Sequence, residues 1–182
     1  TLEKTLKSVV QNPKYIFKLA IQGVMVGIFA GLMVCFYRFL LYGSEHVLRE
    51  YLAIINGNVV YIILFFVALI IMGLLVDFLT KWEVDSAGSG IPQVYAEVKG
   101  HMEANWIKVL FSKIVSGVLT ALGGLSLGPE GPSVQIGGMA GKGVAKLFKG
   151  SKTDELRLIL VGSAVGITAA FNAPRSRSEE RR

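Results

Sequence analysis

Two long apolar runs dominate the first half of the chain. Residues 15–42 are apolar apart from a few isolated polar positions, and residues 59–76 contain no polar side chain other than that of Tyr61. A membrane core of roughly 30 Å needs about 20 residues of helix to cross it. We therefore expect both runs to span a membrane as helices. The polar segment 43–58 is expected to be the loop that joins them.

Glycine recurs at every fourth position within the first run, at Gly23, Gly27 and Gly31. This spacing places the three glycines on one face of a helix, where a second helix can approach closely. Glycine is also common in membrane helices without such a role. The pattern leaves both interpretations open.

The second half of the chain contains two loops rich in glycine and proline within apolar sequence. Residues 85–94 place small residues before Pro92, and residues 127–138 hold one carboxylate, Glu130, between glycines and prolines. Proline is favoured at the first position of a helix. We therefore predict a short helix ending near Lys99, and a longer one that starts at Pro132 and runs to about Phe148. Such partial helices within a membrane are tolerated where they line a cavity, so two of them predict one shared site.

Two further helices complete the pattern. Residues 105–127 form a third apolar segment that contains Lys108 and Lys113, and residues 156–171 form a last helix rich in small residues. Lys108 can extend to the cytoplasmic surface. Lys113 lies more than a turn deeper, and it is either a second lysine that reaches the surface or a source of positive potential near the site.

The Glu130 loop has the chemistry of an anion site. A helix that begins there directs its positive dipole end and unpaired N–H groups at whatever lies before it. Glu130 is itself an anion, so it can occupy this site and leave it on protonation. Ser89 can offer a hydroxyl from the other loop. The alternatives are that Glu130 is only a capping carboxylate and that Ser89 is only a helix cap.

Composition supports a membrane protein. Of 182 residues, 52% are hydrophobic, 18% are charged and 21 are glycine, which is too apolar for an ordinary soluble domain. The net charge of +6 comes from basic residues scattered at segment ends, so we expect no nucleic-acid partner. The single Cys35 excludes a disulfide within the chain and a cysteine-based metal site. We expect no metal, no cofactor and no enzyme activity.

The distribution of lysine predicts the orientation in the membrane. Four lysines lie before the first span or in its first turn. Arg49 is alone between the two spans, and Lys81 follows the second span. The positive-inside rule then places the N-terminus in the cytoplasm and residues 43–58 outside. Residues 1–13 alternate lysine with apolar positions and are expected to form an amphipathic helix on the cytoplasmic surface.

Three motifs, taken in order, resemble consecutive signatures of the CLC family of voltage-gated chloride channels and chloride/proton antiporters. They are Gly88-Ser89-Gly90-Ile91-Pro92, then Gly128-Pro129-Glu130-Gly131-Pro132 with the Val134–Gly138 segment after it, and finally residues 166–174. The resemblance implies an all-α integral membrane fold of the CLC type with re-entrant half-helices. It covers only the first of the two inverted repeats.

The same resemblance implies roles for individual residues. Ser89 corresponds to the serine that coordinates the central chloride, Glu130 to the gating glutamate, and Lys113 to a buried lysine of the family. Further anion-binding groups are implied at Gly90, Ile91 and Gly131. The implied function is chloride transport, as a channel or as an antiporter that also moves protons. The implied location is a bacterial plasma membrane, and family members are homodimers.

Two features depart from the family. A basic residue usually precedes the gating glutamate, whereas Pro129 stands there in this chain, and we expect an altered rate or affinity. The resemblance covers residues 14–174 and then gives way to a basic tail at 175–182, which suggests a frameshift or truncation. The alternative is a natural basic tail in the cytosol. The second half of the family fold would supply further chloride ligands, an internal proton-transfer glutamate and the dimer interface. We therefore expect chain 1–182 alone to transport little chloride.

Overall fold

The described part of the chain is entirely helical. The computed structural model describes residues 13–55, 59–125 and 127–171, and no strand occurs in these ranges. The elements are α2 (Pro13–Ile55), α3 (Val59–Trp82), the short 3-10 helix η1 (Val84–Ser86), α4 (Ile91–Val98), α5 (Trp106–Leu122), α6 (Glu130–Leu147) and α7 (Lys152–Ala170). The predicted all-α class is confirmed. The amphipathic helix expected before Pro13 and the tail at 175–182 lie outside the described residues.

Helix α2 is much longer than the sequence pattern suggested. It continues through residues 43–55, so the prediction of a loop over 43–58 was wrong for this part of the segment. Polar residues are frequent there, but none breaks a helix, and the Ser44 hydroxyl donates to Leu40 O at 2.8 Å as a helical serine can. With 43 residues the helix is about 65 Å long, roughly twice the thickness of a membrane core.

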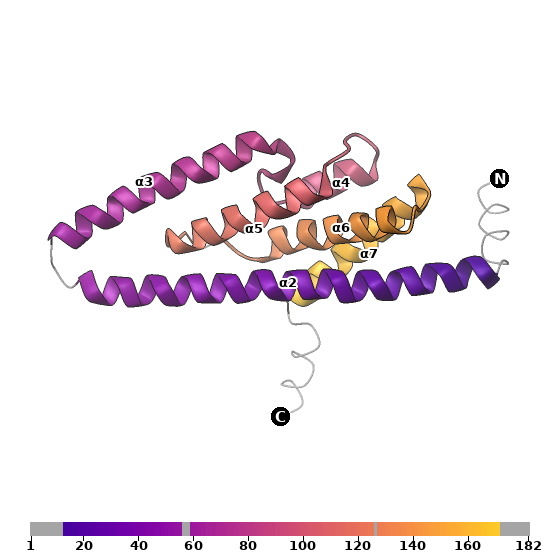
Figure 1. Ribbon diagram of the computed structural model, residues 1–182, viewed down its shortest axis with the longest axis horizontal. Helices are drawn as coiled ribbons and strands as arrows, with labels where there is room; N and C mark the ends of the chain where they lie inside the picture. The colour runs from indigo at the N-terminus through magenta and orange to yellow at the C-terminus, as the bar shows by residue number, and fades with distance from the viewer. Residues whose placement is uncertain (1–12, 56–58, 126, 172–182) are drawn as a thin grey trace, which may run out of the picture.

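Helices α2 and α3 are the two described helices that are long and apolar enough to cross a membrane. They diverge from their junction, and α3 lies along the outside of the molecule (Figure 1). Helix α3 extends six residues beyond the predicted span, to Trp82, and none of its residues is buried. A helix that is apolar on all sides and unburied is suited to contact with lipid or with other membrane helices.

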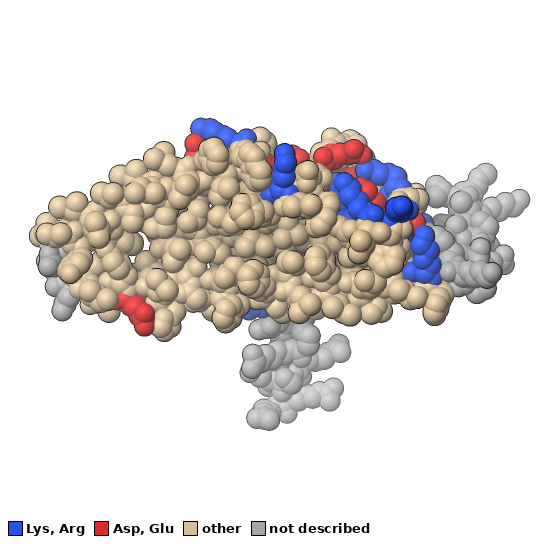
Figure 2. Space-filling model, in the orientation of Figure 1, with Lys and Arg blue, Asp and Glu red and all other residues tan. Residues whose placement is uncertain are grey.

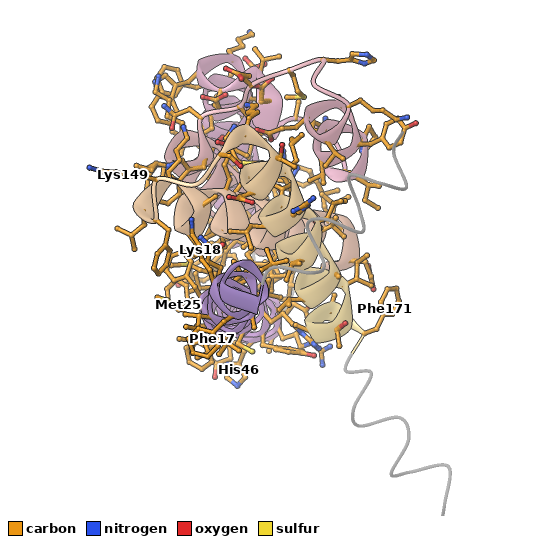
Figure 3. The ribbon with its side chains drawn as sticks, turned by 90° about the vertical axis from the view of Figure 1, so that its right-hand side faces the viewer. Phe17, Lys18, Met25, His46, Lys149 and Phe171 are labelled. Atoms are coloured by element: carbon orange, nitrogen blue, oxygen red, sulfur yellow. The ribbon has the colours of Figure 1, made fainter. Side chains whose placement is uncertain are left out.

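Helix α6 forms the centre of the molecule. It lies between α5 and α2 with α7 packed against it, and its residues 133–145 are all buried. Viewed nearly along α2, helix α7 crosses obliquely beside α2 (Figure 3). A Cβ atom at Gly137, Gly141 or Gly162 would overlap a main-chain carbonyl of the facing helix. The small residues of α7 therefore allow close packing against α6, as the composition of residues 156–171 indicated.

The glycines of α2 do not serve close helix packing within the described chain. A Cβ atom at Gly23 or Gly27 would meet nothing within 4 Å, and one at Gly31 would meet only Val165 at 4.0 Å. Of the two interpretations left open by their spacing, close contact with another helix of the described chain is not observed.

Candidate anion site

The N-terminal ends of α4 and α6 meet at Ser89. A Cβ atom built on Gly131 would lie 2.6 Å from Ser89 O and 3.0 Å from Ser89 Oγ. Gly90 precedes α4 with φ 95°, a left-handed conformation that favours glycine, and Pro92 follows in the first turn. The two glycine-rich loops, about 40 residues apart in sequence, are therefore in direct contact in space.

Helix α6 begins earlier than predicted. Its first residue is Glu130, so Pro132 occupies the third position and not the first. The first helical hydrogen bond runs from Ser133 N to Pro129 O at 3.0 Å. Proline is compatible with the third position as well, because N–H groups in the first turn have no partner within the helix. The N–H groups of Glu130 and Gly131 lie at this unpaired end.

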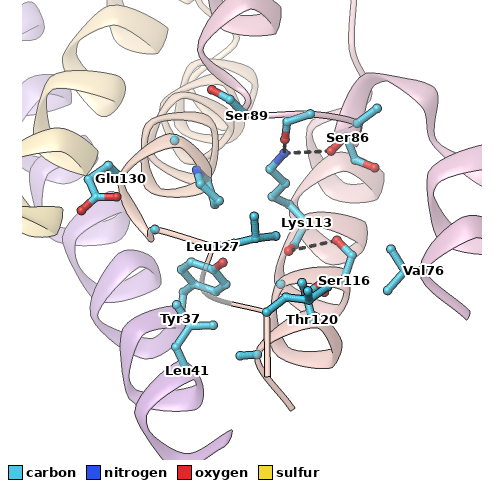
Figure 4. A pocket seen from close by; sticks show the side chains of 18 of the residues that line it. Tyr37, Leu41, Val76, Ser86, Ser89, Lys113, Ser116, Thr120, Leu127 and Glu130 are labelled. Carbon is cyan, nitrogen blue, oxygen red and sulfur yellow. Dashed lines mark hydrogen bonds between the residues drawn. The ribbon is translucent and has the colours of Figure 1, made fainter. Parts of the chain in front are cut away.

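Both loops border one cavity of about 580 Å³. Its lining includes five of the residues that the sequence singled out, which are Ser89, Ile91, Lys113, Glu130 and Gly131. Gly90 is not part of the lining, because it is buried against the side chain of Gln135. Figure 4 shows this cavity, with Ser89 and Lys113 on one side and Tyr37 and Leu41 on another.

Ser89 does not act as the N-cap of α4, because Gly90 occupies that position. The Ser89 hydroxyl oxygen accepts from Ile91 N at a long distance of 3.4 Å. This contact uses an oxygen lone pair and leaves the hydroxyl proton available to another acceptor.

Lys113 is buried beside the loop that precedes α4. It is 4% exposed, and Nζ donates to Ser86 O at 2.8 Å and to Gly88 O at 2.6 Å. The interpretation of Lys113 as a lysine that reaches the surface was therefore wrong. Two main-chain carbonyls hold it in place of water, and they fix the ammonium group at the wall of the cavity (Figure 4).

The Glu130 side chain folds back over Gly128, where its Oε2 atom occupies the space that a Cβ atom of residue 128 would take. Gly128 also borders a second cavity of about 320 Å³, which is lined by Pro129, Arg38 and Glu45 among others. The two cavities share lining residues around Leu127 and Gly128. The carboxylate of Glu130 therefore lies where the two cavities adjoin.

A buried ion pair behind the site was missed from the sequence. Lys142 Nζ contacts Glu97 Oε1 and donates to Ala104 O at 2.7 Å, and both side chains are almost completely buried. The pair joins α4 to α6. Lys142 lies 45 residues from Glu97, and nothing in a single sequence indicates that they meet. Near the same end, Lys152 donates to the exposed Glu103 at 2.6 Å, which lowers the pKa of Glu103.

These features define a class of protein. Two helices long and apolar enough to cross a membrane, two helix N-termini that converge on one cavity and a buried cation at its wall are typical of a membrane protein that handles anions. The comparison with protein families agrees. The family model described as voltage-gated chloride channel matches residues 72–175, which is more than half of the chain. The chain belongs to this family, whose members are channels or transporters and not enzymes.

Proposed function

We propose that this protein carries chloride across a membrane through the cavity between α4, α5 and α6, with Glu130 as the gating carboxylate. The observation that carries the proposal is the convergence of the two helix N-termini on the wall of one cavity, with Glu130 at its junction with a second cavity. Membership in the chloride channel family supports the choice of anion.

The arrangement can bind an anion without a metal or cofactor. Unpaired N–H groups at the start of α6 and the Ser89 hydroxyl are hydrogen-bond donors, and the dipoles of both helices favour negative charge at this place. Lys113 adds positive potential near the loop before α4. Because two carbonyl oxygens hold the Lys113 ammonium group, it contributes positive electrostatic potential and stays in place when the anion moves.

Glu130 suits a gate because it carries the same sign of charge as chloride. A carboxylate at the positive end of α6 competes with a chloride ion for the same donors, and its protonation removes that competition. The titratable and charged groups that line the two cavities with Glu130 are Tyr37, Arg38, Tyr42 and Glu45 from α2 and Lys113 from α5. Chloride alone would pass in a channel, whereas exchange for protons through Glu130 would make the protein an antiporter.

Equilibrium binding of chloride to the purified chain tests the proposal. Binding should become tighter as the pH is lowered, because a protonated Glu130 would no longer compete. The Glu130→Gln variant keeps the size of the side chain but not its charge. It should bind chloride about tenfold more tightly at pH 7.5, which corresponds to about 1.4 kcal/mol, and without pH dependence. Equal, pH-independent binding by the wild type and the variant would reject the gating role.

A further inference from the structure

The hydroxyl groups in the wall of the cavity differ in whether their protons are in use. The lining contains six hydroxyl-bearing residues, which are Tyr37, Thr80, Ser86, Ser89, Ser116 and Thr120. A hydroxyl has one proton, so a group that already donates to a carbonyl cannot also donate to an anion. The hydrogen bonds of each group therefore decide which of them can bind one.

Four of these hydroxyls already donate to main-chain carbonyls. Thr80 donates to Val76 O at 2.8 Å, and Ser86 donates to Glu83 O at 2.7 Å. Ser116 and Thr120 donate to the carbonyls of the residues four positions earlier, each at 2.6 Å. These four present oxygen lone pairs to the cavity, which do not attract an anion.

Tyr37 and Ser89 remain. Tyr37 is 2% exposed, yet its hydroxyl has no hydrogen-bond partner among the described residues. The ring is buried while the hydroxyl borders the cavity, so its proton is available to an acceptor that enters the cavity. In Figure 4 the Tyr37 ring extends from α2 toward Leu127, on the side of the cavity away from Ser89.

The neighbouring helix is shaped to admit this side chain. A Cβ atom at Gly117 of α5 would overlap the Tyr37 hydroxyl and would lie 2.9 Å from Cε2 of the ring. Glycine at this position therefore lets the phenol lie against α5, with its hydroxyl at the wall of the cavity. The ring packs tightly, so the position of the hydroxyl is fixed.

We propose that the Tyr37 hydroxyl is a second hydrogen-bond donor, supplied by α2, to a small monovalent inorganic anion in this cavity. The proposal rests on the proposed function, because it assigns one more anion ligand to the same cavity. Ser89 and Tyr37, which are 52 residues apart in sequence, would then present hydroxyl donors from two elements to the same cavity. Tyr37 would then contribute to affinity, and Glu130 to the response to pH.

Isothermal titration of the purified chain with sodium chloride, against sodium gluconate, tests the assignment. Tyr37→Phe keeps the ring and removes only the hydroxyl, so it should raise the chloride Kd about tenfold or more, as expected for the loss of a hydrogen bond to an ion. Gly117→Ala should produce a similar loss by displacing the hydroxyl. The matched control is Tyr51→Phe, which removes a hydroxyl of α2 that bonds to Tyr61 O and does not line the cavity. Its Kd should stay unchanged.

The outcomes separate this proposal from the function on which it rests. If Ser89→Ala weakens chloride binding while Tyr37→Phe and Gly117→Ala both bind like the wild type, the Tyr37 assignment is wrong and the anion site stands. The Tyr37 hydroxyl would then form hydrogen bonds only with water. If the wild type binds no chloride at either pH 5 or pH 7.5, the proposed function and the Tyr37 assignment are both rejected. Circular dichroism of each variant confirms that a change in Kd does not come from unfolding.

Discussion

Gly131 is the position where the two half-helices touch, and it has no room for a side chain. The atoms nearest to a Cβ added at this glycine belong to the main chain and side chain of Ser89, and a main chain cannot move aside cheaply. The need for glycine here is therefore a matter of contact between two loops, and it does not come from an unusual backbone angle. This single residue sets the distance between Ser89 and the start of α6.

Gly131→Ala should separate the two loops and weaken the site. We expect a loss of about 1–3 kcal/mol in the free energy of unfolding, as for other overpacked positions, together with weaker chloride binding. Thermal denaturation and chloride titration measure the two effects. The control is Gly23→Ala in α2, where a Cβ atom meets nothing within 4 Å and where alanine should be neutral or stabilising. Equal stability of the two variants would show that the contact with Ser89 is not tight.

Glu130→Gln should abolish the response of chloride flux to pH. The experiment uses liposomes and a protein that contains both halves of the family fold, because the resemblance implies that the second half supplies further chloride ligands. Flux of the unmodified protein should rise as the pH falls and Glu130 is protonated. The variant should conduct at all pH values and move no protons.

The control for this experiment is Glu83→Gln. Burial, followed by the negative charge of Asp85, raises the pKa of Glu83. It lies between α3 and η1 and does not line the cavity. Its variant should keep the pH dependence of the wild type. A pH response that is lost in Glu83→Gln and kept in Glu130→Gln would move the gate to the other carboxylate.

At the scale of elements, α4 is held against α6 by one buried ion pair. Lys142 of α6 meets Glu97 of α4 and the carbonyl of Ala104 in the loop after α4, and Glu155 of α7 lies 3.9 Å from the same ammonium group. Glu97 Oε2 is buried and has no hydrogen-bond partner in the described part of the chain. Burying two charges is costly, so this pair contributes more to the arrangement of the helices than to net stability.

Removing one member of the pair should be worse than removing both. Glu97→Leu or Lys142→Leu alone leaves a buried charge without its partner and should cost about 3–5 kcal/mol. The double variant Glu97→Leu with Lys142→Leu should recover most of that loss, because both charges are gone. Thermal unfolding of the four proteins forms a double-mutant cycle. Additive losses would mean that the two side chains do not interact.

The helices were more predictable than the contacts between them. Helix α4 ends at Val98, one residue from the predicted end, because Pro92 and the glycines before it are strong local signals. Residues 43–55 were mistaken for a loop because their polarity suggested one, although polar residues can continue a helix beyond the membrane. The Glu97–Lys142 pair and the Tyr37–Gly117 contact depend on tertiary packing. No periodicity of the sequence predicts them.

At the scale of the whole molecule, basic residues gather toward one end. Lys18 near the start of α2 and Lys146, Lys149 and Lys152 around the turn between α6 and α7 lie at that end. On the face shown in Figure 2, the opposite end, around the junction of α2 and α3, shows no Lys or Arg side chain among the described residues. Lysine and arginine are enriched on the cytoplasmic side of membrane proteins. The distribution supports a cytoplasmic N-terminus.

The length of α2 sharpens the prediction of topology. A helix of about 65 Å that starts at the cytoplasmic surface crosses a core of roughly 30 Å and leaves its last turns beyond the membrane. Those turns carry Glu45, His46, Arg49 and Glu50, which are exposed. Residues 43–55, expected to belong to an external loop, are the last turns of this helix, and their location outside the cell stays a prediction.

Cysteine labelling tests this orientation. A cysteine introduced at Glu45, in a background where the exposed Cys35 is replaced by alanine, should react with an impermeant maleimide added outside intact cells. A cysteine at Lys149, an exposed residue in the turn after α6, should react only after the membrane is opened. Both sites are exposed, so a difference in labelling reports the side of the membrane and not burial. Labelling of the Lys149 position from outside, with protection at Glu45, would invert the topology and place the cavity bordered by Pro129 and Arg38 toward the cytoplasm.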